Sequence, residues 1–249
     1  MEPTRQGSAL TIPSAIIIAA TIIAIALIYV LKPASSAPAT ATAPSGAGEV
    51  NMAPVTPADH ILGNPDAPIK IVEYSDPSCP FCKVFNPTMV QIMGTYGAGG
   101  KVAWIYRDFP LDKPDANGNV LHKNAGTEAQ AMECAASLGG NDKFWKYQQE
   151  WYQNVPQEAG GRSVADDQKQ IMQTAKDIGL DTVSFNECLT SGQFKSKVEK
   201  EYLDGLNAGV SGTPYSIIIT PTGSKIPLPG VQSYATIKSA IDTLISEIK

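Results

Sequence analysis

The sequence lacks the motifs of several common classes of enzyme and binding protein. It contains no glycine-rich phosphate loop and no Gly-x-Ser-x-Gly elbow, which argues against nucleotide hydrolysis and serine-esterase chemistry. It has no run of basic residues, and its net charge is −5, so we expect no binding of nucleic acid. Only two histidines and four cysteines are present, which leaves few side chains to hold a transition metal.

The beginning of the chain is its most apolar part. Residues 7–31 carry no charge, and residues 12–31 are almost wholly apolar. Because about twenty helical residues span the roughly 30 Å of a bilayer's hydrocarbon core, we expect an N-terminal transmembrane helix, with residues 1–32 as a membrane anchor. A cleavable signal peptide is the alternative, although its apolar core is ordinarily only about 7–15 residues long.

The residues that follow the apolar segment predict a tether and then a globular domain. Residues 33–57 are rich in Pro, Ala, Ser, Thr and Gly, a composition typical of an extended, solvated linker. Residues 58–249 remain for the domain itself. An even number of cysteines behind a membrane segment indicates an oxidising, extracytoplasmic compartment.

The domain is organised around the motif Cys-Pro-Phe-Cys at residues 79–82. Residues 69–74 alternate and are β-branched, which predicts a buried strand, and apolar residues at helical spacing follow the motif. Pro80 fits the first position of that helix, so Cys79 would be its N-cap. There the free N–H groups and the positive end of the helix dipole favour a thiolate. We therefore predict that Cys79 is the nucleophile and that Cys82 resolves the mixed disulfide.

A Cys-x-x-Cys motif can also form half of a zinc site. A zinc site would need a second pair of ligands. The remaining cysteines, Cys134 and Cys188, are far apart in the sequence, and so are the two histidines, His60 and His122. The strand before the motif and the helix after it favour redox chemistry.

The rest of the domain alternates between strand and helix patterns. Further strands are predicted at residues 101–107, 215–220 and 225–228. A long stretch between the first two of these has helical patterns, with predicted helices at 128–138, 142–153 and 166–178 and an apolar stripe along 194–206. A last helix is predicted at the end of the chain, at 237–248. A strand–helix–strand unit with a helical insertion predicts an α/β fold.

A proline stands at the start of the predicted strand at residues 215–220. Pro214 has no N–H to donate to a strand ladder, so its position needs a conformational reason. A cis Thr213–Pro214 bond would make a tight turn and would face the backbone of Thr213 toward the thiols. A trans proline at a strand edge is the alternative.

Three segments taken together resemble the DsbA-like thiol:disulfide oxidoreductases, namely residues 71–82, 106–110 and 209–214. The branch with Cys-Pro-Phe-Cys is the most similar, and the resemblance extends over residues 59–249. It implies a thioredoxin fold interrupted by a helical domain, here at about residues 115–195. It also implies an enzyme that needs no metal and no organic cofactor.

The resemblance assigns roles to individual residues. Cys79 matches the attacking cysteine and Cys82 the resolving one, while Pro214 matches the cis proline, and Thr213 before it offers backbone hydrogen bonds to an extended substrate. Glu73 matches a buried acid beneath the active site, whose raised pKa would let it relay the proton of Cys82. For Glu73, an exposed position on an edge strand is the alternative.

Two positions depart from the pattern of proteobacterial DsbA. Phe81 stands where Cys-Pro-His-Cys has histidine, and Thr213 stands where valine usually precedes the proline. Because both positions touch the thiolate's surroundings, the family's oxidising strength does not carry over. Cys134 and Cys188 lie in the helical insert, and we expect a structural disulfide between them, with two unpaired buried cysteines as the alternative.

The sequence thus predicts a single-pass membrane protein with a cytoplasmic N-terminus and a redox domain in the periplasm or at the cell surface. Its disulfide Cys79–Cys82 would oxidise cysteines of substrate proteins, and the resemblance implies a quinone-linked membrane reoxidant. One alternative is a reductase or isomerase kept reduced by a membrane donor. The other is a metal carrier or chaperone that uses the Cys-x-x-Cys pair as ligands.

Overall fold

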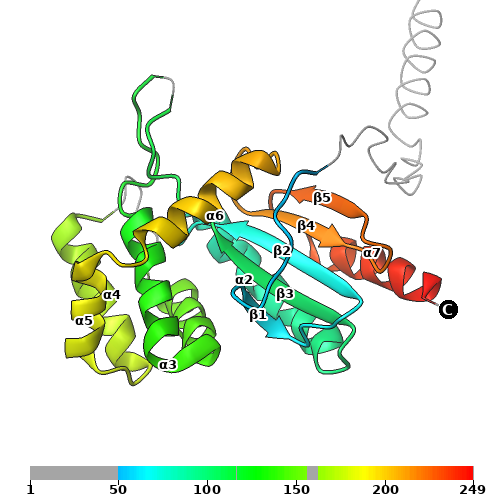
Figure 1. The fold of residues 1–249 in the computed structure, drawn as a ribbon, viewed down its shortest axis with the longest axis horizontal. Coiled ribbons are helices and arrows are strands. Elements are labelled where there is room, and N and C mark those ends of the chain that lie inside the picture. The colour runs from blue at the N-terminus through cyan, green and yellow to red at the C-terminus, as the bar shows by residue number, and fades with distance from the viewer. Residues whose placement is uncertain (1–49, 116, 156–161, 249) are drawn as a thin grey trace, which may run out of the picture. The chain divides into compact units, whose positions relative to one another are not determined.

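The computed structural model describes residues 50–115, 117–155 and 162–248. The predicted transmembrane helix and most of the predicted linker lie outside these residues. Within the described residues, no helix is both long and apolar enough to cross a bilayer. The described chain forms a mixed sheet of five strands in the order β1-β3-β2-β4-β5 (Figure 1). The strands are β1 (His60–Gly63), β2 (Ile69–Ser75), β3 (Val102–Asp108), β4 (Tyr215–Ile219) and β5 (Lys225–Pro229).

The centre of the sheet is a strand–helix–strand unit. Strands β2 and β3 are parallel and are joined by helix α2 (Pro80–Ile92), which continues into the π-helical turn η1 (Met93–Gly97). The other neighbouring strands pair antiparallel. Because β2 lies between β3 and β4, the carboxyl end of a central strand leads directly into the Cys-x-x-Cys motif.

The alternating side chains of β2 divide between two apolar layers. Ile69 and Ile71 belong to the core formed with α2 and the last helix α7 (Tyr234–Glu247), while Val72 and Tyr74 face the other layer. Helix α6 (Lys195–Asn207) packs against the second layer. The period of two predicted from the sequence therefore decides which side chains of β2 lie beneath α2.

The helical insert contains α3 (Ala125–Asn154), α4 (Val164–Asp177) and α5 (Thr182–Ser191). The two helices predicted at 128–138 and 142–153 are the two arms of α3, which is kinked at Gly139 and Gly140. Gly140 has a φ of 73°, in the left-handed region that favours glycine. The aromatic residues of the second arm are buried, and Trp145 packs on Trp104 of β3, so insert and sheet share one apolar core.

Two features of the fold are not predicted from the sequence. Strand β1 pairs antiparallel with β3. The end of the predicted linker also packs against the domain: Val50 and Met52 are buried, and Lys225 donates a hydrogen bond to the carbonyl of Val50 at 2.9 Å. The part of the linker that is described therefore belongs to the packed domain, because its apolar side chains complete the second layer.

Candidate active site

The two cysteines of the motif occupy different environments at the start of α2. Cys79 is the N-cap, with extended backbone, and Pro80 is the first helical residue. Both cysteines are free thiols. Cys79 lines a cavity of about 760 Å³, whereas Cys82 is completely buried one turn further along the helix. Cys79 is itself only 3% exposed, but it borders the cavity, whereas Cys82 is not one of the cavity's lining residues.

Thr213 and Pro214 lie against the motif, although they are far from it in the sequence. The Thr213–Pro214 bond is cis, the geometry expected from the sequence. The sulfur of Cys79 lies 3.4 Å from the carbonyl oxygen of Thr213, which accepts a hydrogen bond from the thiol. The backbone of Thr213 thus borders the reactive sulfur at the place where an extended substrate would have to lie.

The pKa of Cys79 is lowered to about 6. The largest cause is a hydrogen bond from the thiol of Cys82, followed by the side chain of Thr213 and the backbone N–H of Cys82, while burial and the charge of Asp76 act in the opposite direction. By strict hydrogen-bond geometry the Cys79 side chain does not cap the helix. The predicted effect of the helix N-terminus is therefore secondary to that of the second thiol.

In the reduced protein, Cys79 is expected to react with iodoacetamide at a half-maximal rate near pH 6, because the thiolate is the reactive form. Cys82 should stay unlabelled, since its thiol is fully buried and burial raises its pKa well above the usual value. Rates of modification at the two sulfurs can be followed by mass spectrometry of the peptide that contains both. Equal labelling of the two cysteines between about pH 5 and pH 8 would contradict this assignment.

Glu73 lies inside the protein beneath the thiols. It is 1% exposed on the central strand β2, between Tyr106 of β3 and Ser216 of β4. The alternative of an exposed edge position is therefore wrong. Burial is the main cause that raises the pKa of Glu73 to about 7, and the charge of Cys79 adds to it. A carboxyl group with this pKa can hold a proton at neutral pH and release it.

Hydroxyl groups connect this region in a buried polar network. The hydroxyl of Tyr152 lies 3.2 Å from the hydroxyl oxygen of Ser75 and 3.2 Å from that of Tyr106. The hydroxyl of Ser75 also acts on Glu73 and on Cys82, where it offsets part of the rise that burial causes in the pKa of each group. Cys82 is thus surrounded by groups that can hold or pass a proton, although no solvent reaches it.

Replacing Glu73 by glutamine is expected to stabilise the reduced protein above pH 7 and to leave its stability nearly unchanged near pH 4. Because the pKa of Glu73 is about 7 in the folded state and 4.5 in its ordinary state, the folded protein keeps a proton that the unfolded chain has lost between these values. The free energy of unfolding therefore falls as the pH rises through this window. Glu73→Gln removes that loss, which is on the order of 3 kcal/mol.

Urea unfolding of the reduced protein at low and high pH measures this effect. Glu247→Gln is a matched control, because Glu247 is exposed near the end of α7. Equal changes in the unfolding free energy of Glu73→Gln at both pH values would show that the carboxyl group does not titrate as described.

Further residues surround the motif, and the sequence analysis assigned them no catalytic role. Asp76 is fully buried and accepts a hydrogen bond from the N–H of Ser78 at 2.7 Å. Its second oxygen lies 2.8 Å from Nδ1 of His122. The hydroxyl of Ser78 donates to Glu128 of α3 at 2.5 Å. These contacts tie the motif to the insert, and because the partners are distant in sequence, no local pattern announced them.

The cavity beside Cys79 has an apolar rim. Phe81 of the motif and Leu121 of the loop before α3 are 63% and 70% exposed, and both line it. His122, Ser211 and Thr213 provide polar groups on its walls. Such a surface suits a peptide segment of a partly unfolded protein, whose apolar side chains are accessible.

The other two cysteines form a disulfide within the insert. Cys134 on α3 and Cys188 on α5 are joined, with their Cα atoms 5.9 Å apart. Both side chains are buried. The disulfide is remote from the Cys-x-x-Cys pair in the sequence and connects the two helices directly.

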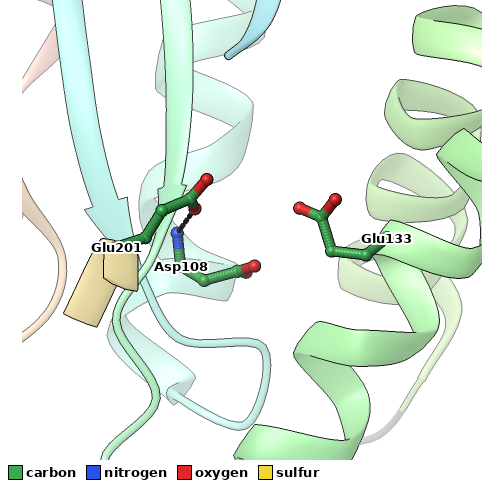
Figure 2. A group of neighbouring side chains, drawn as sticks. All are labelled: Asp108, Glu133 and Glu201. Carbon is green, nitrogen blue, oxygen red and sulfur yellow. Dashed lines mark hydrogen bonds between the residues drawn. The ribbon is translucent and has the colours of Figure 1, made fainter. Parts of the chain in front are cut away.

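Figure 2 shows a second group of titratable side chains, where Asp108, Glu133 and Glu201 converge from β3, α3 and α6. Their ligand atoms lie within 4.8 Å of one another. Lys197 supplies a cation, at 2.5 Å from Glu133 and 2.6 Å from Glu201. Burial is the main cause that raises the pKa of Asp108 well above its usual value. The group thus anchors the insert to the sheet through the chain's own charges.

The arrangement of possible metal ligands bears on the alternative that the protein is a metal carrier. Across the described ranges 50–115, 117–155 and 162–248, this acidic group is the one set of three or more side chains placed to hold a metal ion. Cys79 and Cys82 do not belong to it. Among the described residues, the two thiols therefore do not form a group with a third histidine, cysteine, aspartate or glutamate ligand.

Comparison with known proteins agrees with this geometry. The sequence model of the Thioredoxin family matches residues 55–243. BdbD from Bacillus subtilis, in its oxidised form, superposes with a TM-score of 0.65 at 23% identity, covering 80% of this chain and all of that chain. Wolbachia pipientis alpha-DsbA1 has the same TM-score at 20% identity and covers 78% of this chain and 94% of its own. Pseudomonas aeruginosa DsbA2 has a TM-score of 0.59 at 25% identity, with 78% and 99% covered.

Two kinds of sequence relative are found. A probable disulfide bond formation protein D of Bacillus cereus is 29% identical over 154 residues, which are 61% of this chain and 66% of that protein. The Na(+)/H(+) antiporter NhaA 1 of Mycolicibacterium gilvum is 32% identical over 110 residues. These are 44% of this chain but only 16% of the antiporter, so this chain spans a small part of the antiporter's length.

Proposed function

The chain belongs to the thioredoxin family and has the fold of the DsbA-like oxidoreductases, and from this premise we propose that it oxidises cysteines of substrate proteins. The observation that carries the proposal is the contrast between the two thiols. Cys79 lines a cavity and has a pKa of about 6, whereas Cys82 is sealed and has a raised pKa. Cys79 is thus suited to act as the nucleophile and as the leaving group in disulfide exchange, and Cys82 is suited to resolve the mixed disulfide.

In the proposed reaction, a substrate thiolate attacks the sulfur of Cys79 in the Cys79–Cys82 disulfide. The bond between the two protein sulfurs breaks, and the electron pair leaves with Cys82. A thiolate is strongly disfavoured in this buried place, so Cys82 takes a proton, and Glu73, whose charge acts on Cys82, is a carboxyl group that can donate it. The product of this step is a mixed disulfide between Cys79 and the substrate.

The second step releases the oxidised substrate. A second substrate thiolate attacks the substrate sulfur of the mixed disulfide, and the electron pair leaves with Cys79 as a thiolate. The low pKa of Cys79 makes it a good leaving group. The substrate has then lost two electrons, and the protein holds a thiolate at Cys79 and a thiol at Cys82.

The proposal also includes the direction of exchange, which depends on the relative stability of the reduced and oxidised protein. A stabilised thiolate at Cys79 stabilises the reduced protein, and a dithiol pair with a stable reduced form is an oxidant. Equilibration with glutathione buffers is expected to give a reduction potential above about −200 mV, and the oxidised protein should form disulfides in a reduced, unfolded substrate. A potential below about −250 mV would instead indicate a reductase.

We also propose an extracytoplasmic location, with a cytoplasmic N-terminus and residues 1–32 as the membrane anchor. The apolar run at residues 12–31 and a second disulfide in the insert support it, since disulfides persist in oxidising compartments. A membrane quinone-linked partner would then accept the electrons left on Cys79 and Cys82. Labelling of Cys79 by a membrane-impermeant maleimide, in intact cells whose Cys79–Cys82 disulfide has first been reduced with a thiol reductant, tests the location, and labelling only after lysis would contradict it.

A further inference from the structure

A buried carboxylate lies directly beneath the reactive cysteine. Asp76 follows β2, and its side chain is fully buried. Its backbone carbonyl accepts the N–H of Cys79 at 3.0 Å, and its carboxylate accepts the N–H of Ser78. Asp76 therefore shapes the turn that presents Cys79. Its negative charge, however, opposes a thiolate there and raises the pKa of Cys79.

The same carboxylate holds a histidine at the cavity. Oδ2 of Asp76 accepts the N–H of Leu111 at 2.8 Å and lies 2.8 Å from Nδ1 of His122. The side chain of His122 is 15% exposed and lines the same cavity as Cys79. Burial lowers the pKa of His122, but the hydrogen bond and charge of Asp76 and the charge of Cys79 outweigh this, and the pKa is raised.

The other charged groups around this cavity already have partners. Lys113 lies 3.0 Å and 3.1 Å from two carboxylates of its surroundings, and Asp115 accepts N–H groups of its own turn. Among the described residues that line the cavity, His122 is therefore the cation coupled to both Asp76 and Cys79.

We propose that His122, held by Asp76, is a positioning residue that sets the acidity and the redox equilibrium of Cys79. Its imidazolium offsets the carboxylate beneath the motif, so a thiolate at Cys79 does not face an uncompensated anion. The oxidised protein has no thiolate, and it therefore holds the proton of His122 less tightly. The proton on His122 thus favours the reduced protein and strengthens the disulfide as an oxidant. The inference rests on the proposed function for the direction of exchange.

The first test is an NMR titration of the unmodified full-length chain in detergent, in both redox states. Because the chain has only two histidines, both can be followed individually. His122 is expected to titrate at least about half a pH unit higher in the reduced protein. His60 stacks on Phe144, pairs with Glu133 and does not line this cavity, so its signals serve as the internal reference. Equal titration of His122 in the two redox states would overturn the proposal.

The second test compares His122→Gln with His60→Gln as the matched control. Thiolate absorbance near 240 nm should show the titration of Cys79 moved up by about one pH unit in His122→Gln. Its equilibrium with glutathione should shift about tenfold toward the disulfide, which corresponds to about 30 mV. His60→Gln should leave both quantities unchanged. A His122→Gln protein that folds and keeps both wild-type values would also overturn the proposal, and if it does not fold, the NMR comparison decides.

These tests separate this inference from the proposed function. The NMR titration needs no substrate, so a redox-dependent pKa of His122 in a protein that oxidises no substrate would contradict only the proposed function. Conversely, full oxidase activity with a His122 pKa that ignores the redox state would contradict only the role of His122.

Discussion

Cys79→Ser is expected to abolish oxidation of substrate proteins, with a loss of rate on the order of a thousandfold or more. Cys79 is the sulfur that lines the cavity, and Cys82 cannot replace it because Cys82 is completely buried. A serine hydroxyl is not ionised at neutral pH and forms no disulfide. The initial rate of disulfide formation in a reduced, unfolded protein measures the loss.

Cys82→Ser should behave differently from Cys79→Ser. With Cys79 still reactive and no thiol to resolve the adduct, the reduced variant should accumulate mixed disulfides when it meets a substrate disulfide. These adducts appear as reductant-sensitive bands on gels, and none should form with Cys79→Ser. Substantial turnover by Cys79→Ser, or adducts on it, would show that a sulfur other than Cys79 is the attacking one.

Removal of the disulfide in the insert should cause the largest loss of stability. The double substitution of Cys134 and Cys188 by alanine opens a loop between residues 54 positions apart. By the chain-entropy model, a loop of about 55 residues corresponds to about 4 kcal/mol in the free energy of unfolding. The disulfide also ties α3 to α5, and both cysteines are buried, so the insert should loosen before the sheet does.

Guanidinium unfolding of the oxidised variant, followed by circular dichroism, measures this loss. Cys79→Ser combined with Cys82→Ser is the matched control, because it removes the other pair of cysteines, whose disulfide closes only a short loop. A change of less than about 1 kcal/mol in the Cys134/Cys188 variant would mean that the bridge adds little to the packing of the insert.

The elements around the motif were predictable because their determinants are local. The alternation in residues 69–74 records which side chains face the core, and Pro80 marks a helix start that needs no N–H. The break in α3 was predictable for the same reason, since Gly140 supplies a backbone conformation that other residues avoid. The roles proposed for Cys79, Cys82 and Pro214 came from motif and resemblance, and the structure brings these residues together.

By itself, then, the sequence determined the strand, the helix and the thiols between them, because side-chain periodicity and backbone sterics act within a few residues. Only the tertiary structure decided how those thiols are tuned. The pKa of Cys79 depends on Thr213, which approaches it from the loop before β4, and on Asp76, whose charge is met by His122 from the loop before α3. Likewise, β1 exists as a strand because β3 offers it an edge. Such contacts join segments that no single window of sequence contains, and the electrostatic energy of a buried group depends on exactly which neighbours the fold places around it.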